Sequence, residues 1–217
     1  DMDPLAQLAS SDVALEAALN RTANRPLYRL EHPVQTVGMA LTVLGLRPSV
    51  GLLAAFIPRH ALQVRSPLLE HFWESSQRRA IACEHIGHQL YSLDPGLGYS
   101  FGLFCHVGMP VLVKAVRGYA GTVTEALARK DRTFTQTENA SHRTDHAVMG
   151  AIVARTWHLP GDVAQAIWLH HDFSCLSDGR FDPTVRHLVA LGLLAEFLDN
   201  QHDGLAPTRE WTQHGQA

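Results

Sequence analysis

Cysteine is scarce in this chain of 217 residues, which holds only three, far apart and without a C-x-x-C spacing. This pattern argues against a disulfide framework and against a cysteine-based zinc ribbon, and it fits a reducing compartment. The three are Cys83, Cys105 and Cys175. Each is expected to serve as a small core residue. We therefore predict a cytoplasmic protein.

Charge is also sparse. Charged residues make up 18% of the chain, the net charge is −3 with histidines neutral, and basic clusters do not exceed pairs such as Arg78-Arg79. A nucleic-acid or membrane surface would require a basic stripe, so the sequence indicates neither partner. The apolar stretches at 50–57 and 188–195 fall far short of the roughly 20 residues of a membrane helix. We also expect no signal peptide.

The familiar motifs of nucleophilic catalysis are missing. The chain has no G-x-S-x-G sequence, and no serine or cysteine is followed by histidine and acid in an established order. The segment Gly96-Leu97-Gly98 lacks the preceding strand that a phosphate-binding loop requires. From these absences we predict no catalytic residue of these classes.

What the chain does have is helical patterning. Apolar residues make up 46% of it, which suffices for a packed core, and no stretch alternates as a strand would. Asp94-Pro95 and Asp182-Pro183 are typical helix starts, and helical spacing also follows Ser66-Pro67. The remaining helices are predicted near 4–10, 12–24, 33–45, 48–57, 96–107, 109–116, 118–130, 134–142, 145–157 and 161–171. The predicted fold is all-α, a compact multi-helix bundle with close approaches at small residues such as Gly38, Gly102 and Gly150.

Composition suggests three parts. Pro58 and Pro67 bracket a polar link that separates an N-terminal helical part, 1–58, from a helical core, 59–200, that carries the histidines of interest. Residues 201–217 are polar and weakly patterned, which predicts a frayed tail with Trp211 docked back. Because Asp1 precedes Met2, we expect a piece of a longer protein.

Four histidines stand out by their positions on predicted helices. The spacing predicts that His106, His146, His170 and His171 converge between packed helices, as ligand sites in helical proteins often do. Imidazoles suit zinc, iron or nickel, whereas magnesium or manganese would want carboxylates. Asp145 and Asp172 each adjoin a histidine along a helix, so they point in other directions and are poor candidates for the same ion, with Asp172, near a helix end, left open as one that could turn toward it.

Two interpretations of these histidines stay open at this point. The favoured one is a set of hydrogen-bonded core residues with no cofactor, and the other is a divalent metal site. His142 and His146, four residues apart, form a further but weaker candidate for a chelating pair.

A set of short motifs runs over nearly the whole ordered length of the chain. Its residues are Ser11–Leu15, Leu19–Asn24, Tyr28, Val34–Val37, Ala40, Leu44-Gly45, Phe72–Ser76, Ala80, Phe101–Gly108, Glu138, Asp145-His146, Gly150-Ala151, Trp157–Pro160 and Ala166–His171. Together these motifs resemble the HDOD family, the HD-related output domain of bacterial signalling proteins.

The resemblance implies lost chemistry. The wider HD superfamily hydrolyses phosphoesters with metals, and His106 matches the histidine of its His-Asp pair, but Val107 replaces the aspartate. Ser75 stands near the place of a first histidine ligand, and Leu191 near that of a closing aspartate. His146 and the pair at 170–171 match metal-ligating positions of the cyclic-dinucleotide phosphodiesterase branch, but that branch's Gly-Tyr-Pro signature is missing.

The resemblance thus predicts a non-catalytic output module, the C-terminal part of a bacterial response regulator. It would act by protein–protein interaction, with an upstream receiver domain as one expected partner, and the family's leading helix would precede residue 1. Trp73, Ser75, Glu138 and Trp157 are expected to have partner-binding or structural roles. The alternative is a residual metal-dependent phosphohydrolase or cyclic-dinucleotide phosphodiesterase that uses the four histidines.

Overall fold

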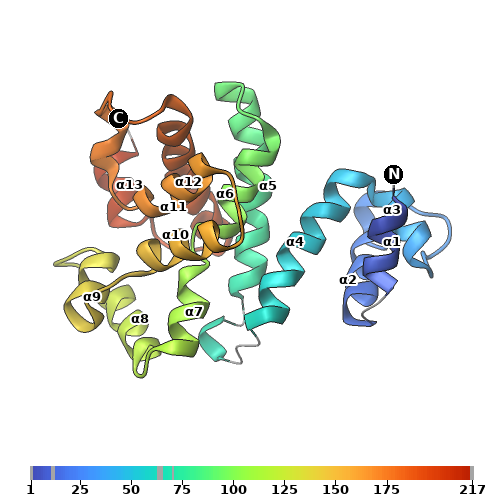
Figure 1. Cartoon of the computed structure of the whole chain (residues 1–217), viewed down its shortest axis with the longest axis horizontal. Helices are drawn as coiled ribbons and strands as arrows, with labels where there is room; N and C mark the ends of the chain where they lie inside the picture. The colour runs from blue at the N-terminus through green and yellow to red at the C-terminus, as the bar shows by residue number, and fades with distance from the viewer. Residues whose placement is uncertain (1, 11–12, 63–65, 70, 216–217) are drawn as a thin grey trace. The chain divides into compact units, whose positions relative to one another are not determined.

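The structure is a computed structural model that describes residues 2–10, 13–62, 66–69 and 71–215. Within these residues every regular element is a helix and no strand occurs, so the predicted all-α class is confirmed (Figure 1). The chain divides into two compact units, Asp1–Gln63 and Val64–Ala217. The four histidines of interest all belong to the second unit, which therefore carries the candidate site.

The first unit is a small helical bundle with its own core. It contains α1 (Asp3–Ser10), α2 (Val13–Ala23), a 3₁₀ turn η1 (Pro26–Tyr28), α3 (Val37–Leu44) and α4 (Leu46–Leu62). Apolar side chains from these helices pack together, among them the fully buried Leu19 and Leu41. The Asn24 side chain accepts from the Val34 amide at 2.7 Å and donates to the Val34 carbonyl at 2.9 Å. These bonds fix the connection from α2 to α3.

Two predicted boundaries near the junction of the units were wrong. The helix predicted at 48–57 was expected to stop before Pro58, but α4 continues to Leu62. A proline removes a single helix hydrogen bond, and the turns on either side still bond to each other. Behind Ser66, residues Pro67–Leu69 form only a 3₁₀ turn, η2, and α5 begins at Phe72. The structure therefore divides the chain after Gln63 rather than after Pro58.

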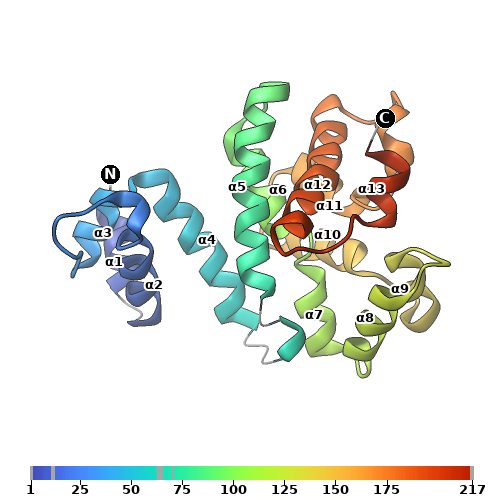
Figure 2. The ribbon, with the colours of Figure 1, turned by 180° about the vertical axis from the view of Figure 1, so that it is seen from behind.

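The second unit contains the remaining helices, and α6 to α11 agree with the predicted ranges to within a few residues (Figure 2). They are α5 (Phe72–Tyr91), α6 (Pro95–Phe104), α7 (Gly108–Ala115), α8 (Tyr119–Ala128), α9 (Phe134–His142), α10 (His146–Thr156), α11 (Gly161–Leu169), η3 (Phe173–Ser177), α12 (Pro183–His202) and α13 (Arg209–His214). The predicted caps are present, because the Asp94 side chain accepts from Gly96 and Leu97 and that of Asp182 accepts from Thr184. Such caps satisfy amide groups that have no partner within the helix.

Glycines set the close approach of α6 to α5. A Cβ atom at Gly98 would lie 2.7 Å from the Cys83 carbonyl oxygen, and one at Gly102 would lie 2.6 Å from that of Arg79. The two helix backbones therefore touch where these glycines stand. Gly38, in contrast, faces open space, so the close approach predicted there is wrong.

The segment Pro95–Ala115 is long and apolar enough by composition to cross a membrane, but 56% of its most apolar window is buried inside the protein. It is broken into α6 and α7, and its role in the core accounts for its composition. At the other end of the chain, α13 forms where a frayed tail was predicted. The Trp211 ring stacks on Phe197 of α12 with centroids 4.0 Å apart, so the predicted docking of Trp211 is present.

Candidate functional site

Four histidines from three parts of the second unit meet in one place. One ring nitrogen of each lies within 4.8 Å of a ring nitrogen of every other. His106 stands in the turn between α6 and α7, His146 is the first residue of α10, and His170 and His171 directly follow α11. The four histidines expected to converge thus lie together, and we call them the histidine cluster.

Two glycines let the first two of these segments touch. A Cβ atom at Gly108 would collide with the carbonyl oxygen of His146 and would lie 2.8 Å from the amide nitrogen of Gly150. Because neither glycine has a side chain, the start of α7 lies directly against the first turn of α10. His106 precedes Gly108 by two residues and is carried to the same place. Its ring centroid lies 5.3 Å from that of His146.

The central ring of the cluster is that of His146, which is fully buried. Its Nε2 atom lies 3.2 Å from Nε2 of His170 and 3.1 Å from Nε2 of His171. The Phe134 ring of α9 packs nearly perpendicular to it, with centroids 5.4 Å apart. Three imidazole nitrogens thus face one another across a space that water reaches poorly.

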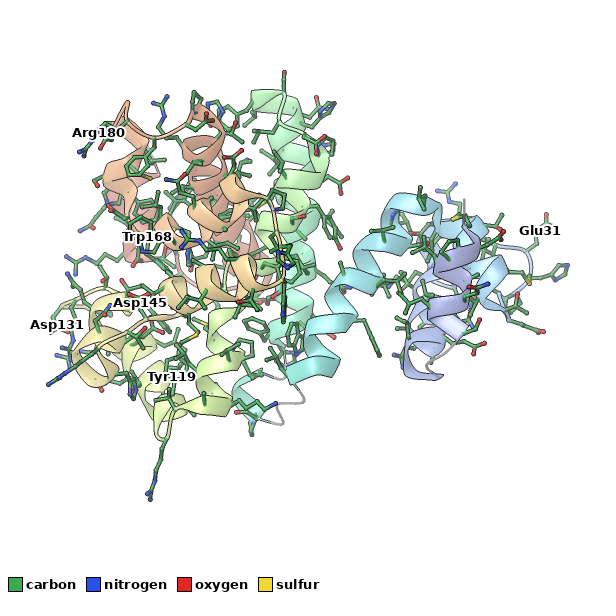
Figure 3. The ribbon with its side chains drawn as sticks, viewed as in Figure 1. Glu31, Tyr119, Asp131, Asp145, Trp168 and Arg180 are labelled. Carbon is green, nitrogen blue, oxygen red and sulfur yellow. The ribbon has the colours of Figure 1, made fainter. Side chains whose placement is uncertain are left out.

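A buried carboxylate holds the other nitrogen of His146. Glu138 on α9 places Oε2 2.7 Å from His146 Nδ1, and the hydroxyl group of Tyr119 donates to its Oε1. All three side chains are fully buried. Figure 3 labels Tyr119 at the beginning of α8. A carboxylate that already accepts from a phenol accepts from His146 Nδ1–H as well, which places a proton on Nδ1.

His170 is fixed in a similar way. Its Nδ1 atom lies 2.7 Å from the carbonyl oxygen of Ile167. A carbonyl oxygen only accepts, so the Nδ1 atom carries the proton and donates it. His170 Nε2 then presents a lone pair to the cluster. His171 Nδ1 is buried and has no hydrogen-bond partner among the described residues.

Burial and mutual proximity favour the neutral form of His106, His170 and His171. Desolvation is the largest cause that lowers the pKa of His106 and His171 well below the usual value, and neighbouring positive charge lowers it further. The same causes lower the pKa of His170 to about 3. Neutral imidazoles are the form that binds metal ions.

Arg79 is a site neighbour that the sequence analysis missed. It is buried on α5, and its charge acts on the pKa values of both His106 and His170. It donates to Asp199 Oδ2 and to Ser76 Oγ, each at 3.2 Å, and its Nε atom has no partner among the described residues. The helical stripe through Ser76 and Ala80 passes beside position 79, so the periodicity held a signal for its burial.

The acids beside the histidines lie outside the cluster, as predicted. Asp145 caps α10 by accepting from Val148 and also accepts from Asn139, while Asp172 caps η3 by accepting from Ser174. No carboxylate among the described residues belongs to the group of atoms that surrounds the cluster centre. The arrangement can therefore hold a cation with imidazole nitrogens, but it offers no acidic ligand.

Side chains that are not metal ligands occupy the three positions that were compared with the metal ligands of HD hydrolases. Val107 and Leu191 are each 1% exposed, and neither side chain can donate or coordinate. Leu191 packs toward Gly87, where a Cβ atom would meet its Cδ1 at 2.7 Å. Ser75 accepts from Arg78 at 3.0 Å and is not part of the cluster.

The remaining sequence candidates lie apart from the cluster centre. Trp73 forms an edge contact with Phe72, with centroids 4.9 Å apart, and Trp157 forms one with Phe104 at 5.9 Å. His142 does not join His146 as a chelating pair, because its Nε2 atom lies 2.8 Å from Thr122 Oγ1. The reason is that α9 ends at His142 and α10 begins at His146, so the two do not share one helix face.

Comparison with known proteins shows which fold this is. A family model described as the HDOD domain matches residues 1–173. A search of curated proteins finds no match. An HDOD domain protein of unknown function from Geobacter sulfurreducens is 22% identical, with a TM-score of 0.76, over 96% of this chain and 69% of that one.

Two further solved structures share the fold. The MmoQ response regulator from Methylococcus capsulatus str. Bath is 22% identical, with a TM-score of 0.52, over 98% of this chain and 88% of its own. A candidate phosphohydrolase from Shewanella amazonensis SB2B is 19% identical, with a TM-score of 0.68, over 100% of this chain and 84% of its own. At these identities the likeness concerns the fold alone.

Proposed function

This chain belongs to the HDOD family, a relative of the HD phosphohydrolases, and from that premise we propose that it is a non-catalytic regulatory module of bacterial signalling. One observation carries the proposal. Val107 directly follows His106 and is 1% exposed, where the resemblance to HD hydrolases calls for an aspartate. A buried aliphatic side chain has no lone pair for a metal ion and cannot position water.

Two further positions support this reading. Leu191 is buried against α5, where the closing carboxylate of a hydrolase would be expected. Ser75 is held by Arg78 outside the cluster. With these three positions lost, a metal bound by the histidines would lack the acidic ligands that support a dinuclear hydrolytic centre.

The output we propose is binding to another signalling domain or protein in the cytoplasm, with a receiver domain as the first candidate. Support comes from the MmoQ response regulator, which shares the fold, and from the charge of the chain. A net charge of −3 with no large basic cluster does not favour nucleic acid or a membrane surface as the partner.

The alternative is a residual metal-dependent phosphohydrolase, and the convergence of four histidines is the observation in its favour. One experiment separates the two functions. The purified chain is assayed with an activated phosphodiester and with a cyclic dinucleotide, in the presence of Mn²⁺, Fe²⁺ or Zn²⁺, beside a His106→Ala variant. We expect equal background rates for both proteins. Metal-dependent turnover that disappears in the variant establishes the hydrolase instead.

A further inference from the structure

At the centre of the histidine cluster, Nε2 of His146 faces Nε2 of His170 and Nε2 of His171 at hydrogen-bonding distances, and the His146 and His170 rings each donate their Nδ1–H outside the cluster. From this geometry we propose that His106, His146, His170 and His171 form a mononuclear site for a borderline transition-metal ion such as Zn²⁺, Co²⁺ or Ni²⁺. Glu138 and Tyr119 act as positioning residues for His146. The inference goes beyond the regulatory role and does not depend on it.

The first step of the argument is the count of protons. His146 donates Nδ1–H to Glu138 and His170 donates Nδ1–H to the Ile167 carbonyl, so in the neutral rings both Nε2 atoms carry lone pairs. These two atoms are 3.2 Å apart. Two lone pairs at that distance repel each other, and a shared cation is what turns the contact into an attraction.

The distances between the imidazole nitrogens are compatible with a shared metal ion. Zinc binds imidazole nitrogen at 2.0–2.1 Å in tetrahedral geometry, which places neighbouring donor atoms roughly 3.3 Å apart. The Nε2 atom of His146 lies 3.2 Å and 3.1 Å from those of His170 and His171. His106 supplies a fourth nitrogen within 4.8 Å of the others. We infer that side-chain rotations on metal binding bring the four nitrogens into a tetrahedral shell.

The other side of the His146 ring has the arrangement that metal-binding histidines usually show. A ligating histidine donates its second N–H to a carboxylate or carbonyl, which fixes the ring and raises its basicity. Glu138 does this for His146, the Tyr119 hydroxyl in turn donates to Glu138, and the Ile167 carbonyl does it for His170. Two of the four histidines are therefore oriented from outside the cluster.

The ligand set also selects the class of metal. Four imidazoles suit zinc, cobalt, nickel or copper, whereas Mg²⁺ and Mn²⁺ prefer carboxylate oxygens, and the described residues offer none at this centre. Among the described residues no carboxylate at this centre can bridge two ions, and the positive charge of Arg79 disfavours the further positive charge that a second ion would add. The site thus takes one ion, in contrast to a dinuclear hydrolytic centre.

Metal titration tests the proposal directly. The chain is expressed without a histidine tag, stripped with chelator and titrated with Co²⁺ alone, with Zn²⁺ in competition and with Mg²⁺ and Mn²⁺ as comparisons. We expect one Co²⁺ per chain with the visible absorption of a tetrahedral nitrogen-bound ion, displacement by Zn²⁺, and no competition from Mg²⁺. His146→Ala and His170→Ala should abolish this spectrum, whereas His142→Ala, on neighbouring α9, should not change it.

The positioning role of Glu138 and Tyr119 is tested separately, by the Co²⁺ affinity of variants at these two positions. Glu138→Gln preserves the shape of the side chain but removes its charge, so we expect Co²⁺ affinity to fall about 10–100-fold with the stoichiometry and spectrum retained. Tyr119→Phe removes one donor to Glu138 and should weaken binding less. Circular dichroism confirms that each variant is folded, and Tyr119→Phe keeps the test decisive if Glu138→Gln is unfolded.

Three results overturn the proposal. They are failure of the folded wild-type chain to bind Co²⁺ or Zn²⁺, binding that His146→Ala leaves intact, and binding of Mn²⁺ with two equivalents per chain. If the wild-type chain binds neither metal, the histidines share protons rather than a metal ion, and the cluster is a structural hydrogen-bond network only.

Discussion

The Nε2 atoms of His146 and His170 lie 3.2 Å apart, and the other nitrogen of each ring donates to an oxygen outside the pair. In water each Nε2 atom would accept a hydrogen bond, but His146 is fully buried and His170 is 6% exposed. In the metal-free neutral cluster these two acceptors face each other, and the donor within reach of His146 is Nε2 of His171, 3.1 Å away. Proton and metal binding to the cluster are expected to compete, and both are expected to change stability.

Acidification below about pH 6.5 should destabilise the metal-free protein. Burial lowers the pKa of His106 and His171 well below 6.5 and that of His170 to about 3. In the unfolded chain these groups titrate near 6.5, so below that pH the unfolded state binds more protons. Their full contribution is present above pH 6.5, and each costs up to roughly 1.4 kcal/mol per pH unit below it. Urea unfolding between about pH 8 and 5 measures this, and a flat profile contradicts it.

Glu196 opposes this trend and offers a second test. Burial raises the pKa of its carboxyl group to about 7, against 4.5 in the unfolded chain. Its stabilising contribution is therefore complete below pH 4.5 and is lost as the pH rises through 7. A Glu196→Gln variant removes this opposing contribution, so its stability should fall more steeply between pH 7 and 5 than that of the wild type. His170→Asn should make the same fall shallower.

The contact of α7 with α10 should tolerate no side chain. Gly108→Ala places a methyl group against the carbonyl oxygen of His146, where only backbone atoms could yield. We expect a loss of roughly 2–5 kcal/mol of unfolding free energy. Gly121 in α8 faces open space, so Gly121→Ala should stabilise the protein by about 0.5–1 kcal/mol. Denaturant midpoints of the two variants should therefore shift in opposite directions, and equal shifts would disprove the contact.

Much of the cluster could be predicted from sequence, because helical periodicity is local. The spacing along 145–157 and 161–171 was enough to aim His146 and His170 at a common centre. The contacts that orient the histidines from outside the cluster could not be predicted in this way. Tyr119 reaches Glu138 from α8 across a loop, and periodicity contains no information on such contacts between helices. Glu138 was singled out only by family resemblance, without its partners.

The burial of Arg79 was not predicted from the sequence. In the sequence it appears only as half of the basic pair Arg78-Arg79, yet it is 7% exposed, while its neighbour Arg78 is only partly buried. The reason lies on α12, where Asp199 accepts from both arginines. Burial of a charge depends on its partner, and this partner is distant in the sequence. The continuation of α4 past Pro58 was also not predicted. Proline was taken as the end of the helix, but the residues on both sides of it are helical.

The ion pair between Arg79 and Asp199 should be the costliest to break from one side. Asp199 is 9% exposed and also accepts from Arg78 Nε at 2.6 Å, whereas Asp203, which accepts from the same Arg78, is 42% exposed. Asp199→Ala leaves the buried guanidinium of Arg79 without its counter-charge. The free energy of unfolding should therefore fall by about 3–5 kcal/mol. Asp203→Ala should cost under about 1 kcal/mol, because water screens that pair.

A double variant separates the cost of an unpaired charge from the value of the pair. Arg79→Met with Asp199→Leu replaces both charges by apolar groups, so most of the stability lost in Asp199→Ala should return, since nothing charged is left buried alone. Urea unfolding of the single and double variants at one pH makes the comparison. If the double variant is as unstable as Asp199→Ala, the pair itself stabilises the fold, and the desolvation argument is wrong. Because the charge of Arg79 also lowers the pKa of His106, the double variant should in addition bind protons at the histidine cluster more readily than the wild type.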